Sequence, residues 1–156
     1  MADDDLDALG VRDGDGLDTG TGVPHFAFNL LDYKLWWLSE IEGRSPEGLP
    51  VVRASGFRFA YRTSIEHFLP SNLAESGDRL AAVNRFGNLC LMTRTENSRR
   101  SDHTPDWKVE KYGESDQSLK FHYMAALQRE EKEWGPRQIS SQGAAMRSVL
   151  LTPLTS

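Results

Sequence analysis

Two short strand-like runs, joined by a long connection that contains a proline, constrain the fold of this chain more than any other feature. The first run alternates from Phe57 to Tyr61 and leads into the segment 63–67, which is the pattern of a strand. Pro70 ends it, because proline cannot donate to a strand ladder and biases the preceding residue towards an extended conformation. The apolar run 89–93 predicts a second strand, so the two form a hairpin whose connection holds a short helical piece near 80–83.

Helical patterns surround this hairpin. Between Phe26 and Ile41, large apolar residues recur at the spacing of one helix face. Thr95 or Asn97 is positioned to open a helix directly after the second strand, and three more helices are predicted near 106–112, 118–132 and 139–151. The expected fold class is therefore α+β, in which a hairpin and a helix are embedded in a mainly helical shell.

Length and composition limit the number of domains. The chain has 156 residues, of which 38% are hydrophobic, and this is enough for one modest core. Residues 1–24 hold seven aspartates and few large apolar side chains, so we expect a disordered acidic tail or linker there and a folded domain over 25–156. The sequence predicts neither a membrane span nor a signal peptide, so we expect a cytoplasmic protein. Cys90 is the only cysteine and lies in an apolar run, which favours a small buried hydrophobe.

The net charge of −5 argues at first against a nucleic-acid partner. Residues 1–24 contribute −6, from seven aspartates and one arginine, and the remaining 17 basic and 16 acidic residues leave the rest of the chain at +1. The body is thus close to neutral and does not exclude such a partner. Either a local phosphate-facing patch or a mixed, solvated surface would account for its basic residues at Arg85, Arg94, Arg99, Arg100, Lys108 and Lys111.

Four side chains around the hairpin suggest hydrolytic chemistry. His67 is suited to take a proton from water near neutral pH, and Glu66 beside it carries a hard oxygen ligand. Asn97 offers a second oxygen, and such a pair would hold Mg²⁺ weakly, with most of its waters retained. Asn88, at the entrance of the second strand, is placed to hydrogen-bond across to the backbone of the His67 loop and so to support the site from behind. Taken singly, these residues usually have structural roles in turns and strand ends, and only their combination indicates a site.

The combination resembles the HNH nucleases of the ββα-metal class, and in particular the C-terminal nuclease domain of GmrSD-like, modification-dependent (type IV) restriction enzymes. The resemblance covers most of 26–152, through the runs LDYKLWW, SIEHFLP, FGNLCL, ENS and SLK at 31–37, 64–70, 86–91, 96–98 and 118–120, and through Trp134, Ile139 and Met146. It implies a ββα-metal core with His67 as general base, Asn88 as the central asparagine of the motif, and Glu66 and Asn97 as ligands of Mg²⁺, for which Mn²⁺ could substitute. It also implies a DNA endonuclease that nicks one strand per site and serves antiviral restriction in bacteria. Substrate phosphate would then contact Arg94, Arg99, Arg100 and Lys108.

Some departures from the family pattern leave alternatives open. Glu66 stands where many HNH sites have Asp or His, and Asn97 replaces a histidine, which favours magnesium or manganese over zinc. Asp102 and His103 are near enough to offer a competing metal ligand, although for Asp102 the cap of the next helix is the favoured role. Full-length relatives carry an N-terminal domain that binds nucleotide and senses modified DNA, and this chain contains no phosphate-binding loop motif of its own. A non-catalytic DNA-binding or interaction module, or an RNA-cleaving toxin domain, remains the alternative to a DNA nuclease.

Overall fold

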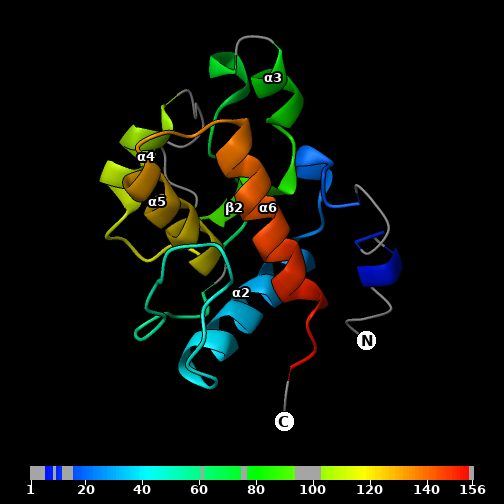
Figure 1. Ribbon diagram of the computed structural model, residues 1–156, viewed down its shortest axis with the longest axis vertical. Helices are drawn as coiled ribbons and strands as arrows, with labels where there is room; N and C mark the ends of the chain where they lie inside the picture. Colours follow the sequence, from blue (N-terminus) through cyan, green and yellow to red (C-terminus); the bar gives the residue numbers. More distant parts are fainter. Residues whose placement is uncertain are drawn as a thin grey trace.

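The computed structural model describes residues 6–8, 10–11, 16–60, 62–74, 77–93 and 103–154, and its ribbon is shown in Figure 1. Short 3-10 helices are labelled η. In chain order the elements are η1 (Gly20–Gly22), α2 (His25–Glu40), β1 (Ser64–His67), η2 (Ser71–Leu73), α3 (Asp78–Ala82), η3 (Phe86–Asn88), β2 (Leu89–Met92), α4 (Pro105–Tyr112), α5 (Leu119–Glu131) and α6 (Pro136–Leu151). None of the helices within these ranges combines the length and the apolar character that a membrane span requires.

The helices begin where local chemistry favours a start. The Thr104 hydroxyl accepts a hydrogen bond from the Trp107 amide at 3.2 Å at the start of α4. The Ser118 hydroxyl does the same for the Phe121 amide at 3.1 Å at the start of α5. Pro136 is the first residue of α6, where its missing N–H costs no intrahelical hydrogen bond. These starts confirm the three helices predicted in the second half of the chain.

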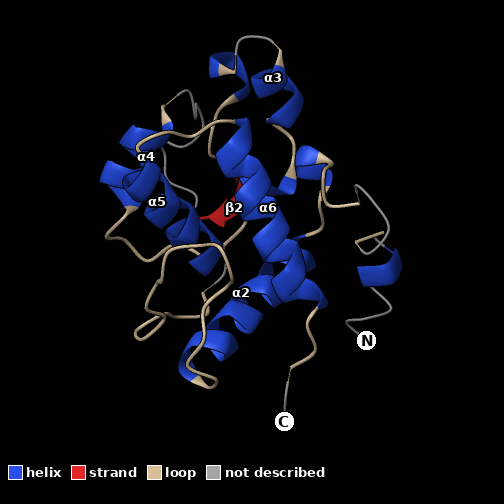
Figure 2. Ribbon diagram, in the orientation of Figure 1, coloured by secondary structure: helices blue, strands red, loops and turns tan. Residues whose placement is uncertain are grey.

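The two strands lie among the helices, as the colours of Figure 2 show for β2. Every residue of β2 is buried, whereas β1 is only partly covered. Helix α2 packs against α5 and α6, and α6 packs closely on η3. One apolar cluster lies around Phe28, Leu35 and Tyr123, and a second forms around Phe68 and Trp134. The sheet is thus a small insert that helices support, and this matches the predicted α+β class.

The strands pair antiparallel, with Ser64 opposite Met92 and His67 opposite Leu89. Their connection, residues 68–88, contains η2, α3 and η3, so the predicted hairpin with a long connection is confirmed. Cys90 on β2 is fully buried, and burial raises the pKa of its thiol to about 12. A thiol with so high a pKa stays protonated at neutral pH and acts here as a core side chain.

The strand predicted over 57–61 is wrong for the described residues 57–60, which lie in a loop, and β1 begins only at Ser64. The alternation does bring Phe57 and Phe59 together, with ring centroids 4.9 Å apart, and Phe59 also contacts Trp36 at 5.8 Å. The two phenylalanines therefore contribute to an aromatic cluster against α2. The alternating side chains pack together, but the backbone of this loop pairs with no strand in the described part of the chain.

Residues 1–24 were expected to form a disordered acidic tail. The described part of this segment differs from that expectation, because Leu6, Leu17 and Val23 are buried in the same apolar cluster as α2. Asp18 accepts a hydrogen bond from the amide of Phe86 at 2.8 Å, which joins the segment to η3. Its sparse apolar residues thus lie on the domain, although the composition around them is that of a linker.

The helix expected to open at Thr95 or Asn97, which would complete a ββα core, lies outside the described residues. The prediction of a ββα-metal core therefore stays a prediction, and only its hairpin is described.

Candidate active site

The candidate site forms where the hairpin strands meet the loop 68–70. His67 is the last residue of β1, and Asn88 immediately precedes β2. The backbone amide of Phe68 donates to the Asn88 carbonyl at 2.8 Å, so strand-like pairing continues one step beyond the ladder. This bond fixes the point at which the chain leaves β1.

The imidazole of His67 is partly exposed, and among the described residues its hydrogen-bond partner is Asn84, which no pattern in the sequence had identified. Its Nε2 lies 2.8 Å from the Asn84 Oδ1. An amide oxygen only accepts, so this contact places the proton on Nε2 and leaves Nδ1 with a free lone pair in the neutral ring. The backbone carbonyl of Asn84 accepts a hydrogen bond from the backbone amide of Gly20 at 3.0 Å. The histidine is therefore oriented by a loop residue that the N-terminal segment supports.

Asn88 is fully buried, and its side chain holds the His67 loop through four hydrogen bonds. Its Oδ1 accepts from the Leu69 amide at 2.8 Å and from the Trp134 indole N–H at 3.0 Å. Its Nδ2 donates to the carbonyls of Leu69 at 3.0 Å and of Val83 at 2.8 Å. Every hydrogen-bonding position of the amide is engaged with the protein, so Asn88 acts on the site through the loop that it holds.

Lys108, predicted to contact substrate phosphate, is only 3% exposed. Its Nζ donates to the His67 carbonyl and, at 3.3 Å, to the Phe68 carbonyl. Lys108, on α4, thus holds in place the same loop that Asn88 holds from η3. The phosphate contact stays a prediction, and the contacts in the structure are with backbone carbonyls.

Glu66 is 9% exposed, and its Oε1 accepts a hydrogen bond from the Ser64 hydroxyl at 2.6 Å. Residues two apart on a strand share a face, so Ser64 and Glu66 lie together, on the side of β1 opposite to its neighbour His67. The carboxylate is a hard oxygen donor, and the Ser64 contact fixes its orientation without neutralising it, which suits Mg²⁺. Asn97, the other predicted ligand, lies outside the described residues. Within those residues no group of three or more His, Cys, Asp or Glu could hold a metal ion.

The remaining predicted residues fall in two groups. Arg94, Arg99, Arg100 and Asp102 lie outside the described part of the chain. His103 is described, and its ring stacks on the Trp107 indole with centroids 3.6 Å apart. The start of α4 is capped by Thr104, so helix capping does not require Asp102.

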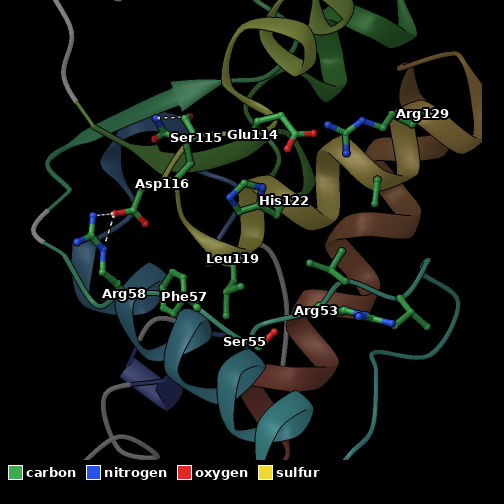
Figure 3. A pocket seen from close by; sticks show the side chains of 15 residues that line it. Arg53, Ser55, Phe57, Arg58, Glu114, Ser115, Asp116, Leu119, His122 and Arg129 are labelled. Carbon is green, nitrogen blue, oxygen red and sulfur yellow. Dashed lines mark hydrogen bonds and ion pairs between the residues drawn. The ribbon is translucent and has the colours of Figure 1, made fainter.

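A cavity of about 500 Å³ lies elsewhere on the molecule, between the loop 51–58 and the start of α5 (Figure 3). Its lining includes His122, whose pKa is lowered from 6.5 by burial, and Arg129, which faces Glu114 in Figure 3. Asp116 at its edge pairs with Arg58 at 2.9 Å. His67, Asn88 and Glu66 do not line this cavity, so it is separate from the His67 site.

These features define an α+β domain in which helices support a hairpin, and Glu66 and His67 are the last two residues of its first strand, with side chains on opposite faces. The chain matches the family model of the C-terminal domain of GmrSD restriction endonucleases over residues 29–149, and it belongs to this family of restriction endonuclease domains. The recognition made from the sequence is thereby confirmed. A search of curated proteins and a search of solved structures each gave no match.

Proposed function

We propose that this domain is a Mg²⁺-dependent DNA endonuclease in which His67 is the general base. The observation that carries the proposal is membership of a restriction endonuclease family over most of the chain, with His67 at the end of the hairpin and its ring oriented by Asn84. Hydrolysis of a phosphodiester requires an activated water, stabilisation of charge on the phosphate and assistance to the leaving oxygen.

In this proposal His67 takes the proton from the attacking water. With Nε2 donating to Asn84, the lone pair of Nδ1 is the one available to accept that proton. The resulting imidazolium would keep its hydrogen bond to the amide oxygen, so the ring needs no reorientation during the step. Asn88 and Lys108 contribute by fixing the loop 67–69, which sets the position of the ring relative to a bound strand.

Glu66 and Asn97 would hold the metal ion. When bound, Mg²⁺ would supply positive charge that stabilises the phosphate and assists departure of the leaving oxygen. The contact between Glu66 and the Ser64 hydroxyl presets the carboxylate before any ion arrives.

The natural product of one such site is a nick, because one constellation performs one hydrolysis. We propose that the domain acts in restriction of foreign DNA within a bacterial cell. Choice of substrate would come from an N-terminal nucleotide-binding and sensor region, in the same longer protein or in a separate subunit. A DNA-binding or interaction module that has kept the fold but lost turnover is the competing function.

The test is conversion of supercoiled plasmid to open circle by the purified protein with Mg²⁺, Mn²⁺ or EDTA. We expect metal-dependent nicking that His67→Ala abolishes and that His25→Ala, a change of an exposed histidine at the start of α2, leaves intact. Both variants should keep the wild-type circular dichroism spectrum. Nicking by His67→Ala at the wild-type rate would remove the general-base assignment. If folded wild-type protein cleaves neither ordinary nor modified DNA, with the N-terminal partner present, the non-catalytic module is the correct description.

A further inference from the structure

A groove of about 510 Å³ lies between residues 81–87 and α6. Asn84, the hydrogen-bond partner of the His67 ring, is one of its lining residues and so connects the groove to the candidate base. Small residues open the α6 side of the groove, at Ser140, Gly143 and Ala144.

Two arginines line this groove. Arg85 is exposed, and its guanidinium makes no hydrogen bond or ion pair with any described residue. Arg147, on α6, has an Nε that is buried and lacks a partner among the described residues. A buried donor without an acceptor is costly and uncommon in a folded protein. The Arg147 side chain as a whole is 30% exposed, so other parts of its guanidinium are accessible to a ligand in the groove.

The groove already holds one anionic group. The carboxylate of Asp18 accepts a hydrogen bond from the Phe86 amide at 2.8 Å through Oδ1, and its Oδ2 lies 3.5 Å from a terminal nitrogen of Arg147. A backbone N–H and a guanidinium that converge on one carboxylate are also the donors that bind a phosphate oxygen. The long distance to Arg147 marks a weak ion pair that a competing anion can replace.

We propose that this groove is the binding site for the phosphodiester backbone of the substrate, with Arg85 and Arg147 as its phosphate contacts and Asp18 as a built-in competitor. The proposal rests on the proposed nuclease function, because it takes the groove to be continuous with the His67 site. It assigns phosphate binding to residues from the loop before η3 and from α6, and it gives the acidic N-terminal segment a role in weakening non-productive binding of DNA.

Charge supports this assignment. Two arginines and one aspartate give the groove lining a net charge of +1, equal to the net charge of the whole body from residue 25 onward. Opening of the Asp18 contact would raise the local charge to +2. Because binding to DNA depends mainly on phosphate neutralisation, a single charge at this place changes affinity measurably.

The proposal can be tested by binding of a fluorescein-labelled DNA duplex, measured by fluorescence anisotropy over a range of salt concentrations. All proteins carry His67→Ala and the buffer contains EDTA, so binding is measured without cleavage. The variants are Arg85→Gln, Arg147→Gln and Asp18→Asn. The matched control is Arg44→Gln, which removes an exposed arginine paired with Glu42 in the loop after α2.

Each groove arginine variant should bind roughly tenfold more weakly and should lower the slope of log K against log salt by about 0.9, the value for one phosphate contact. Arg44→Gln should leave affinity and slope at their starting values. Asn at position 18 can still accept from the Phe86 amide but carries no charge, so Asp18→Asn should strengthen binding by up to about fivefold.

Salt slopes for Arg85→Gln and Arg147→Gln that equal the slope for Arg44→Gln would overturn the proposal. An unchanged affinity for Asp18→Asn would overturn the role of Asp18 as competitor. Arg85 is exposed, so its variant keeps the test valid even if Arg147→Gln unfolds. The two hypotheses fail separately: normal nicking with unchanged slopes removes only the groove, whereas lowered slopes without any nicking remove only the nuclease.

Discussion

Replacement of Asn88 by alanine should remove a large part of this domain's free energy of unfolding, and the structure gives a lower limit for that loss. The side chain makes four buried hydrogen bonds, to both backbone groups of Leu69, to the Val83 carbonyl and to the Trp134 indole. Each buried group left without a partner costs about 1–3 kcal/mol. The sum is therefore at least about 4 kcal/mol, against a total stability of about 5–15 kcal/mol for an ordinary domain.

The assay is urea unfolding followed by tryptophan fluorescence and by circular dichroism, with the thermal midpoint as a second measurement. A loss of 4 kcal/mol corresponds to a fall of about 10 °C or more in Tm for a domain of this size. Asn84→Ala is the matched control, because it removes an exposed asparagine side chain whose amide hydrogen-bonds to the His67 ring and to no other described residue. It should change stability by less than about 0.5 kcal/mol. Trp134→Phe, which removes one of the four bonds, should fall between the two.

If Asn88→Ala unfolds at the same urea concentration as Asn84→Ala, the reasoning is wrong, and the amide would then have a role in chemistry that its buried bonds do not explain. If the expected order is found, loss of nicking by Asn88→Ala reports a loosened His67 loop. The activity of Asn84→Ala then becomes the informative measurement, since that variant keeps the fold and releases the ring.

Three further predictions concern the support of the site. A Cβ at Gly87 would overlap the Ile139 carbonyl and lie 2.7 Å from the Gly143 amide. Gly87→Ala should therefore lower the free energy of unfolding, measured by urea titration, by at least about 2 kcal/mol. A Cβ at Gly143 would have contacts of 3.4 Å or longer, so Gly143→Ala should be neutral or stabilising. Burial raises the pKa of Asp32 from 3.8 to about 7 and lowers the pKa of Lys120 from 10.5 to about 7. Between about pH 4 and 7 the folded state holds more protons on Asp32 than the unfolded state does, so stability should fall as pH rises through this range. Between about pH 7 and 10 the folded state holds fewer protons on Lys120, so stability should rise again, and Lys120→Met should remove only this alkaline rise. A flat stability profile between about pH 7 and 10 for the wild type would contradict this reasoning. Ser118→Ala, which removes the cap of α5, should lower the free energy of unfolding by about 1 kcal/mol, and an unchanged urea midpoint would show that the cap contributes nothing.

The sequence was sufficient for the elements whose formation depends on local patterns. Helical spacing located α2, α4, α5 and α6, and the proline after the first apolar run located the end of β1. The loop 57–60 was misassigned because alternation reports which side chains share a face, and here the shared face packs on Trp36. The buried residues Leu6 and Leu17 were missed because isolated apolar residues among aspartates have no periodicity to detect.

The site residues also divide into those that local sequence motifs identify and those that only the folded structure brings together. His67, Glu66 and Asn88 lie in contiguous motifs and could be selected from the sequence, although their roles stay predictions. Asn84 and Arg147 could not be selected, because one is an ordinary loop asparagine and the other lies on a helix that begins more than forty residues after the hairpin ends. Their relation to His67 exists only after α6 packs on η3.

The buried polar side chains around the hairpin share one physical cause. A two-stranded sheet is marginal by itself, and its connection leaves many backbone carbonyls without ladder partners. Asn88 serves Leu69 and Val83; Lys108 serves His67 and Phe68; Lys120, on α5, donates to the carbonyls of Phe86 at 2.8 Å and Leu89 at 2.5 Å. Each of these polar side chains thus makes hydrogen bonds to the backbone that a further strand or turn would otherwise make. A buried polar residue near His67 is therefore as well explained by this support as by catalysis, and only a variant that keeps its unfolding free energy while losing turnover separates the two.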